Sequence, residues 1–318
     1  MNQIFSNAKF MAAKTEVLKL FRCSDLPPLL SGVIVLWLGT LLAPVQGYAW
    51  RWAVAEFATL ALIALMLVFF WIRELYGTKS QTRPVALAIS GFPEDVPWCL
   101  TGLVSRATLT KLSYSAAAVA VLSGLILQFY FQTGDWTMAL VVVALLGGYA
   151  AAAPPVRWGS RPGSALVAGV ALGSLPLVAG FYLQSGHWAS ELFLFALPLM
   201  ASGACVYLSQ EFRDYATDWQ AGHRTLVVRL GPIGAALVYT LANILAIIGM
   251  VLIILFPATP LPYHQGLWLI ILLAVINQEM VKRRKYKEPR GQTMLWRLTG
   301  LVNISMEIWF LIMAGARL

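Results

Sequence analysis

Long runs of apolar residues, separated by short polar segments, dominate this chain. A membrane-spanning helix takes about 20 residues, and about nine runs are long enough, or nearly so, to span a bilayer. Backbone groups inside a bilayer have no water to bond, so each run is expected to be a helix. The pattern therefore predicts an all-α, multi-pass membrane bundle of about nine transmembrane helices. The runs cover approximately residues 28–46, 52–72, 110–132, 136–153, 163–184, 189–208, 231–256, 265–281 and 296–315.

Composition supports a membrane protein. Hydrophobic residues make up 59% of the chain and charged residues 12%, whereas soluble domains carry about 25% charged residues. The mean hydropathy is +0.73. No linker divides the apolar runs, so we expect residues 27–318 to form a single transmembrane domain. Residues 1–26 are expected to form a cytoplasmic N-terminal tail with some amphipathic character.

The basic residues predict an orientation. The net charge of +9 is explained by cytoplasmic loops rich in Lys and Arg, so we expect a lipid bilayer and no nucleic acid as partner. The loops near residues 133, 186 and 260 contain neither Lys nor Arg. This asymmetry predicts a protein of the inner (cytoplasmic) membrane with its N-terminus and active loops in the cytoplasm. The basic loops lie at about residues 73–109, 157–161, 213–229 and 282–290.

The polar stretch QEFRDYATDWQAGHRTLVVRLGP (210–232) follows the sixth apolar run. Its acidic residues Glu211, Asp214 and Asp218 are spaced i, i+3 and i+7, which places them on one face of a helix. Carboxylate oxygens suit Mg²⁺, which commonly shares its coordination with substrate phosphate. Arg224 and Arg229 follow and can neutralise such a phosphate. A simpler interpretation is a solvated helix end, although such ends usually mix Lys with the acids.

A metal-bound diphosphate beside lipid indicates a polyprenyl diphosphate ligand, and this motif has a counterpart in a known family. Asp214 and Asp218 followed by AGHRTLVVRLG (221–231) resemble the second aspartate-rich motif of the UbiA superfamily of intramembrane prenyltransferases. The resemblance is nearest to the branch that prenylates dihydroxynaphthoate in menaquinone synthesis. The segment GGYAAAAPPVRWG (147–159) is similar to the family's Tyr-rich segment that ends in P-P-x-R.

The resemblance implies an enzyme that moves an isoprenoid chain from a polyprenyl diphosphate to an aromatic or other lipophilic acceptor, with Mg²⁺ as cofactor. It implies catalytic, metal-binding roles for Asp214, Asp218 and Glu211. The residues expected to contact the diphosphate are Lys79, Arg83, Arg157, Arg224 and Tyr149.

The chain departs from the family where a first acidic motif is expected, near FFWIRELYG (69–77). Glu74 is the only acid there, and Arg73 lies beside it. The positive charges of Arg73, Lys79 and Arg83 are one substitute for a lost metal, and a fold-back of Glu94 and Asp95 is another. Two other functions stay open: a protein that binds or presents an isoprenoid without transfer, and a lipid transporter.

A further acid lies inside the last apolar run. Asn303 and Glu307 are spaced i, i+4, and an ionisable residue within a membrane span indicates a functional site by default. A protonated glutamate that is hydrogen-bonded within the bundle explains the same pattern.

Overall fold

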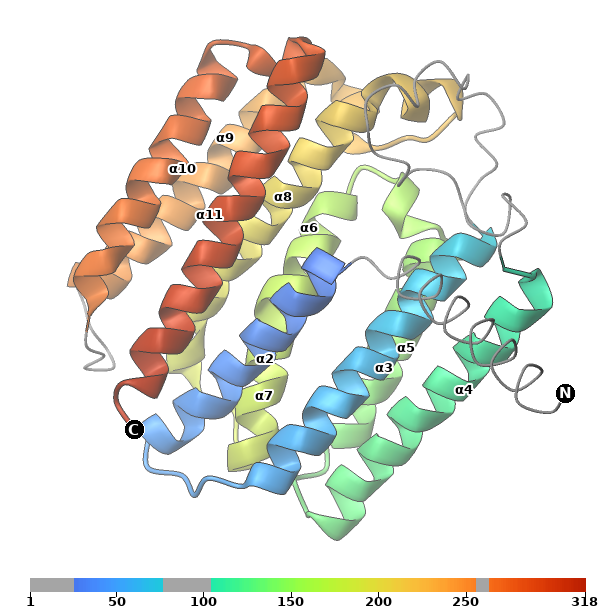
Figure 1. Ribbon diagram of the computed structural model, residues 1–318, viewed down its shortest axis with the longest axis vertical. Helices are drawn as coiled ribbons and strands as arrows, with labels where there is room; N and C mark the ends of the chain where they lie inside the picture. Colours follow the sequence, from blue (N-terminus) through green and yellow to red (C-terminus); the bar gives the residue numbers. More distant parts are fainter. Residues whose placement is uncertain (1–25, 77–103, 256–262) are drawn as a thin grey trace, which may run out of the picture.

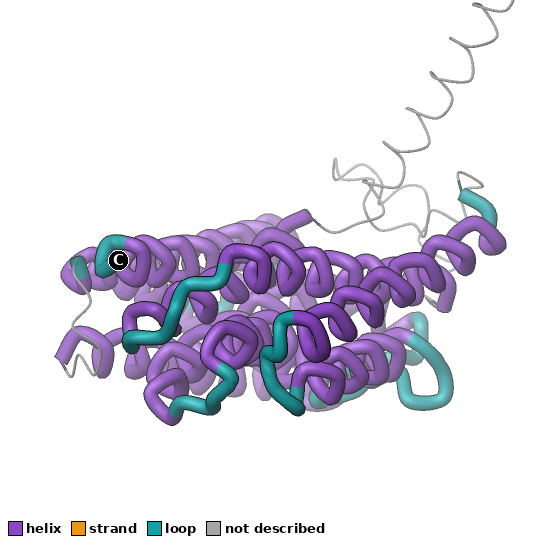
Figure 2. Tube along the Cα trace, turned by 90° about the horizontal axis from the view of Figure 1, so that it is seen from below, coloured by secondary structure: helices purple, strands orange, loops and turns teal. Residues whose placement is uncertain are grey.

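The computed structural model describes residues 26–76, 104–255 and 263–318, and these ranges contain helices and loops without any strand (Figure 2). Eight helical segments are long and apolar enough to cross a membrane, and the shorter helix α5 is also apolar. Each predicted apolar run therefore corresponds to a helical segment, and the predicted all-α membrane bundle is confirmed. The predicted boundary at residue 26 stays a prediction, because residues 1–25 lie outside the described ranges.

Within each described range the helices follow one another with short connections (Figure 1). Two spans contain a π-helical turn: η3 (Ile126–Tyr130) continues α4, and η5 (Val170–Ser174) joins α6 to α7. The helices are α2 (Leu26–Val45), α3 (Trp52–Tyr76), α4 (Arg106–Leu125), α5 (Thr137–Ala152), α6 (Ser164–Gly169), α7 (Leu175–Ser185), α8 (Phe193–Gln220), α9 (Leu226–Leu255), α10 (Leu267–Lys282) and α11 (Pro289–Gly315). The short 3₁₀ turns are η4 (Trp158–Ser160), η6 (Ser190–Leu192), η7 (His264–Gly266) and η8 (Lys285–Lys287).

Helices α8 and α9 extend beyond the apolar runs that predicted them, and both of these extensions lie at the charged end. Helix α8 continues to Gln220 and so carries the acidic residues. Helix α9 begins at Leu226, ahead of a kink at Gly231, where φ is 71° and ψ is 163°. Glycine tolerates this positive φ, and Pro232 cannot donate a backbone hydrogen bond. The kink therefore separates a first turn beside the acidic residues from the long membrane-spanning part.

Helices α2 and α7 approach each other closely because glycines face the contact. A Cβ atom on Gly39 would lie 2.0 Å from the Leu177 carbonyl oxygen, and one on Gly180 would lie 2.2 Å from the Leu36 carbonyl oxygen. Small residues drive helix association in membranes because they allow the backbones to pack directly. This contact fixes the position of α2 within the bundle.

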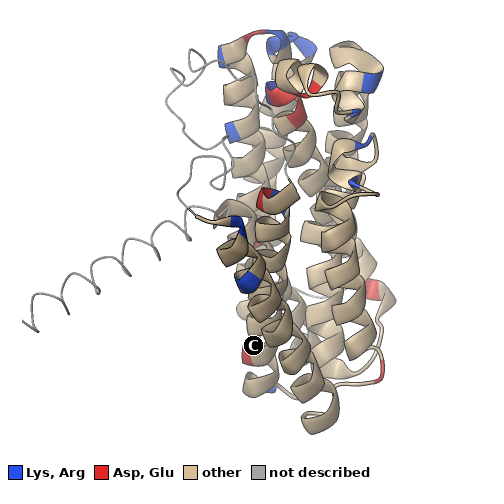
Figure 3. Cartoon of the chain, turned by 90° about the vertical axis from the view of Figure 1, so that its right-hand side faces the viewer, with Lys and Arg blue, Asp and Glu red and all other residues tan. Residues whose placement is uncertain are grey.

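Charged residues gather toward one end of the described bundle, with fewer at the other (Figure 3). The sparse end includes Arg51, between α2 and α3, and the structure explains its presence there. The Arg51 guanidinium donates to the Phe131 carbonyl at the end of η3, and its backbone exchanges hydrogen bonds with the Gln184 side chain. Arg51 thus joins three helix ends, a structural task that the charge pattern did not predict.

Candidate functional site

The last two turns of α8 present Asp214 and Asp218, as the sequence spacing predicted. Asp214 Oδ1 lies 3.3 Å from Arg213 Nε, and Asp218 Oδ1 lies 3.0 Å from His223 Nδ1. The two carboxylate side chains are 21% and 17% exposed. Both acids are therefore partly shielded from solvent yet reachable from the charged end of the bundle.

Glu211 occupies a different environment from the other two acids. It is 4% exposed, and its two oxygens already accept hydrogen bonds. Ser164 Oγ donates to Oε1 at 2.5 Å, and the Val227 backbone N–H donates to Oε2 at 3.2 Å. The first N–H groups of a helix have no partner within it, so Glu211 satisfies the start of α9 and joins it to α6 and α8.

The predicted metal-binding roles of Glu211, Asp214 and Asp218 stay predictions, and the structure does not group all three around one position. Among the described residues, no three acidic, histidine or cysteine side chains are grouped so that they could hold a metal. The spacing i to i+7 covers about 10 Å along a helix, which is too far for a single ion. The oxygens of Glu211 are also already engaged by Ser164 of α6 and by the Val227 N–H of α9.

The loop between α5 and α6 bridges the end of α3 to the end of α8. Arg157 Nη2 donates to the Tyr76 carbonyl of α3 at 3.5 Å, and the rings of Tyr149 and Tyr76 lie 6.2 Å apart, edge to face. On the other side, the Arg224 backbone N–H donates to the Ser160 carbonyl at 3.0 Å. The structure thus places the predicted residues Tyr149 and Arg157 at the end of α3, and Arg224 beside the same loop.

The end of α3 carries Arg73, whose guanidinium carbon lies 5.9 Å and 5.7 Å from the ring centroids of Phe69 and Phe70. Tyr207, two turns before Asp214 on α8, lies between the end of α3 and the acidic residues. Its hydroxyl donates to the Gly159 carbonyl at 3.4 Å. Arg73, Glu211, Asp214 and Asp218 all lie within electrostatic range of that hydroxyl. The i, i+7 spacing of Tyr207 and Asp214 was the sequence signal for this missed residue.

Two cavities adjoin the charged end. The first cavity has a volume of about 350 Å³ and is lined by Arg224, Val228 and Arg229. Both arginines that the sequence suggested for phosphate binding therefore border the same cavity. Lys79, Arg83, Glu94 and Asp95 lie outside the described residues.

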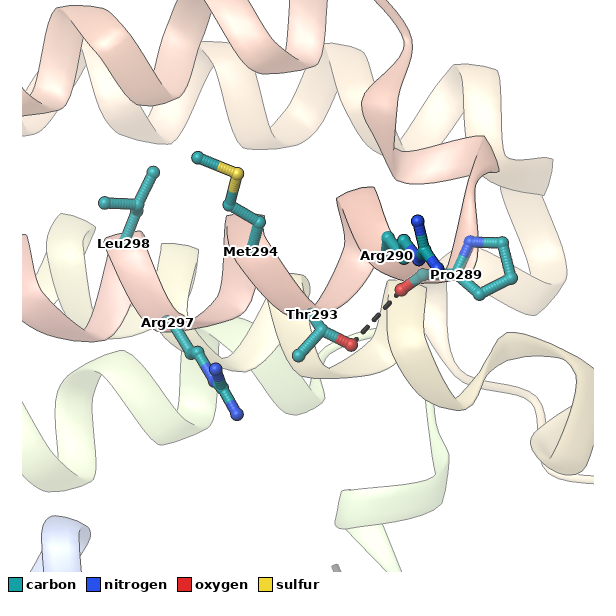
Figure 4. A pocket seen from close by; sticks show the side chains of 6 residues that line it. All are labelled: Pro289, Arg290, Thr293, Met294, Arg297 and Leu298. Atoms are coloured by element: carbon teal, nitrogen blue, oxygen red, sulfur yellow. Dashed lines mark hydrogen bonds between the residues drawn. The ribbon is translucent and has the colours of Figure 1, made fainter. Parts of the chain in front are cut away.

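The second cavity, of about 520 Å³, lies along the first turns of α11. Arg297 and Thr293 point to one side of the helix, and Met294 and Leu298 point to the other (Figure 4). Trp296, which directly precedes Arg297, contacts Arg213 of α8. The guanidinium carbon of Arg213 lies 4.6 Å from the ring centroid of Trp296. Sequence reasoning missed the contact between Arg213 and Trp296, because that contact depends on how α11 packs against α8.

The donor chemistry of the described residues fits one Mg²⁺ ion. Asp214 and Asp218 supply hard carboxylate oxygens from adjacent turns, and Mg²⁺ normally completes its shell with water and substrate oxygens. At the end of α3, by contrast, the side chains of Arg73 and Glu74 offer one carboxylate beside a cation. A second ion held by aspartates at that position is therefore not supported by the residues present.

Comparison with known proteins gives this arrangement its context. The model of the UbiA prenyltransferase family matches residues 97–299. The 2-carboxy-1,4-naphthoquinone phytyltransferase of Synechocystis sp. (strain ATCC 27184 / PCC 6803 / Kazusa) is 24% identical over 257 residues, which are 80% of this chain and 78% of that protein. The 1,4-dihydroxy-2-naphthoate octaprenyltransferase of Bacillus subtilis (strain 168) is 25% identical over 129 residues, and that match spans 40% of each protein.

Solved structures show the same fold at low sequence identity. A UbiA homolog from Archaeoglobus fulgidus bound to GPP and Mg²⁺ has a TM-score of 0.65 and 17% identity, and the alignment covers 92% of this chain and 99% of that one. The apo UbiA homolog from Aeropyrum pernix K1 has a TM-score of 0.63 and 17% identity, with 90% and 96% covered.

The family match runs from before α4 into α11 and includes both aspartates and the loop that bridges them to α3. It covers more than half of the 318 residues, and the resemblance inferred from the motifs is confirmed. This chain belongs to the UbiA prenyltransferase family and is an integral, multi-pass membrane protein.

Proposed function

We propose that this protein transfers an isoprenoid chain from a polyprenyl diphosphate to a lipophilic aromatic acceptor at the charged end of the bundle. The observation that carries the proposal is the pair Asp214 and Asp218 on α8, which the loop that contains Arg157 joins to the end of α3, where Arg73 lies. Acids on one side and cations on the other suit a diphosphate bridged by metal on one face and bound by guanidinium groups on the other.

Asp214 and Asp218 would hold one Mg²⁺, which when bound neutralises the diphosphate and makes it a better leaving group. Arg157 lies in the bridging loop, Arg224 bonds to that loop through its backbone, and both would bind the diphosphate oxygens. Tyr149, packed against Tyr76, would orient the same group. Glu211 fixes the helix ends that carry these residues, so its role is to position the site.

Arg73 gives the end of α3 a fixed positive charge where the family resemblance implies a metal site. Preorganised cations stabilise the charge that develops on a leaving group, so Arg73 would contribute to ionisation of the allylic C–O bond. Lys79 and Arg83 belong to the same proposal by sequence position. The diphosphate leaves as the allylic C–O bond breaks, the acceptor ring carbon forms the new C–C bond to the allylic carbon, and the proton of that ring carbon passes to the released diphosphate.

A naphthoate-type quinone precursor is the acceptor class that the relatives support, since two of them are named for naphthoate or naphthoquinone substrates. The basic loops gather at the same end as the acids, which supports a cytoplasmic location for the site under the positive-inside rule.

A second candidate function is isoprenoid binding and presentation without transfer. Its specific support is the pair Arg73 and Glu74 at the end of α3, where an acidic motif is expected. A UbiA-like bundle with one metal site retains a means of binding a diphosphate even if ionisation is too slow for turnover.

One experiment separates these functions. A non-hydrolysable polyprenyl diphosphate analogue is titrated into the purified protein with and without Mg²⁺, for the wild type, for Asp214→Asn with Asp218→Asn, and for Glu279→Gln as a control at an exposed acid of α10. Mg²⁺-dependent binding that only the double variant loses supports the site.

Turnover of a polyprenyl diphosphate with dihydroxynaphthoate then supports transfer. Binding without turnover across a panel of aromatic acceptors supports presentation. Binding that is indifferent to Mg²⁺ and to both aspartates would overturn the proposal.

A further inference from the structure

Glu307 is a buried carboxyl group in the middle of a membrane span, remote from the site proposed above. It is 1% exposed. Its Oε1 accepts a hydrogen bond from Ser31 Oγ of α2 at 2.6 Å and another from Asn303 Nδ2, one turn earlier on α11, at 2.5 Å. The three side chains therefore tie the first described helix to the last, which lie side by side (Figure 1).

Among the residues that the structure describes, none supplies a counter-charge to Glu307 at its depth. Helix α2 contains no charged residue from Leu26 to Val45. On α11 itself the nearest charged residue within the span is Arg297, ten residues and about 15 Å away along the axis. Across the other elements packed against α2 and α11, charged residues lie toward the helix ends: Glu56, Arg73 and Glu74 on α3, Glu211, Arg213, Asp214 and Asp218 on α8, Glu279 and Lys282 on α10, and Lys285 and Lys287 in η8.

Two oxygen atoms of this cluster lack a hydrogen-bond donor among the described residues. Glu307 Oε2 and Asn303 Oδ1 are both buried and have no hydrogen-bond partner among the described residues. Both atoms are acceptors if the glutamate is ionised. An unpaired buried carboxylate is strongly disfavoured, and two buried acceptors without a donor would add a further cost.

A single proton resolves both problems. A protonated carboxyl group has one O–H donor and retains acceptor capacity. We propose that Glu307 is an uncharged carboxylic acid whose Oε2–H donates to Asn303 Oδ1, so that acid and amide exchange two hydrogen bonds while Ser31 binds Oε1. The cluster is a neutral polar clamp between α2 and α11.

Infrared difference spectroscopy of the purified, folded protein tests the protonation state directly. The spectrum of Glu307→Gln is subtracted from that of the wild type, and Glu279→Gln serves as the matched control, since Glu279 is exposed and paired with Arg283 at 2.8 Å. We expect Glu307→Gln to remove the carbonyl band of a protonated carboxylic acid and Glu279→Gln to remove the bands of an ionised carboxylate. Removal of ionised-carboxylate bands by Glu307→Gln would overturn the proposal.

A second variant keeps the test available if Glu307→Gln does not fold. Ser31→Ala retains the acid but deletes one hydrogen bond to its carbonyl oxygen, so the acid carbonyl band is expected to shift to higher frequency and the thermal midpoint to fall. An acid band that is unchanged in Ser31→Ala would show that Ser31 is not part of the clamp. Absence of any protonated-acid band in both wild type and Ser31→Ala would refute the neutral acid itself.

Discussion

Replacing Glu211 distinguishes a structural brace from a metal ligand. The side chain accepts hydrogen bonds from Ser164 Oγ and from the Val227 N–H, and both bonds are buried. Hydrogen bonds to charged groups contribute about 1.5–3 kcal/mol each, so removing both in Glu211→Ala is expected to cost about 3–6 kcal/mol of stability. In Glu211→Gln one amide oxygen remains as an acceptor, and about half of that loss is expected.

The assay combines two measurements on the same purified variants. Unfolding in detergent reports stability, and Mg²⁺ titration of diphosphate-analogue binding reports the metal site. We expect Glu211→Gln to unfold more readily but to keep the wild-type Mg²⁺ midpoint. Asp214→Asn is expected to show the reverse, because its carboxylate is partly exposed.

A Glu211→Gln variant that unfolded like the wild type, while its Mg²⁺ midpoint rose as far as that of Asp214→Asn, would refute the structural role of Glu211. That result would mean that Glu211 leaves Ser164 and Val227 to join the aspartates when the metal binds.

Two further predictions concern packing. Arg213→Ala and Trp296→Leu each remove a cation–π contact of 4.6 Å, which contributes about 0.5–2 kcal/mol. We expect similar losses of stability that are non-additive in a double-mutant cycle. Additive losses would show that the contact contributes nothing. Gly180→Ala places a methyl group 2.2 Å from a backbone oxygen of α2. We expect it to lower the thermal midpoint several times more than Gly147→Ala, whose methyl group meets nothing within 4 Å. Equal midpoints for the two variants would contradict close α2–α7 packing.

The helices and their number were determined by the sequence, because the bilayer leaves the backbone no alternative. Any run of apolar residues long enough to span must satisfy its hydrogen bonds internally, so the pattern of apolar residues maps directly onto α2 to α11. The face shared by Asp214 and Asp218 also followed from helical spacing, since it depends on one helix only.

Contacts between helices were decided by the tertiary structure. Spacing along α8 placed Glu211 with the aspartates, but in the folded protein its oxygens accept hydrogen bonds from the start of α9 and from the hydroxyl of Ser164. Tyr207 and Arg73 come from different helices, and Trp296 reaches Arg213 only because α11 packs against α8. Likewise, the sequence suggested that Asn303 binds Glu307, whereas the addition of Ser31, 276 positions away, required the fold. The periodicity of the sequence determines which residues share one face of a helix, and the packing of the helices determines which residues of other helices that face contacts.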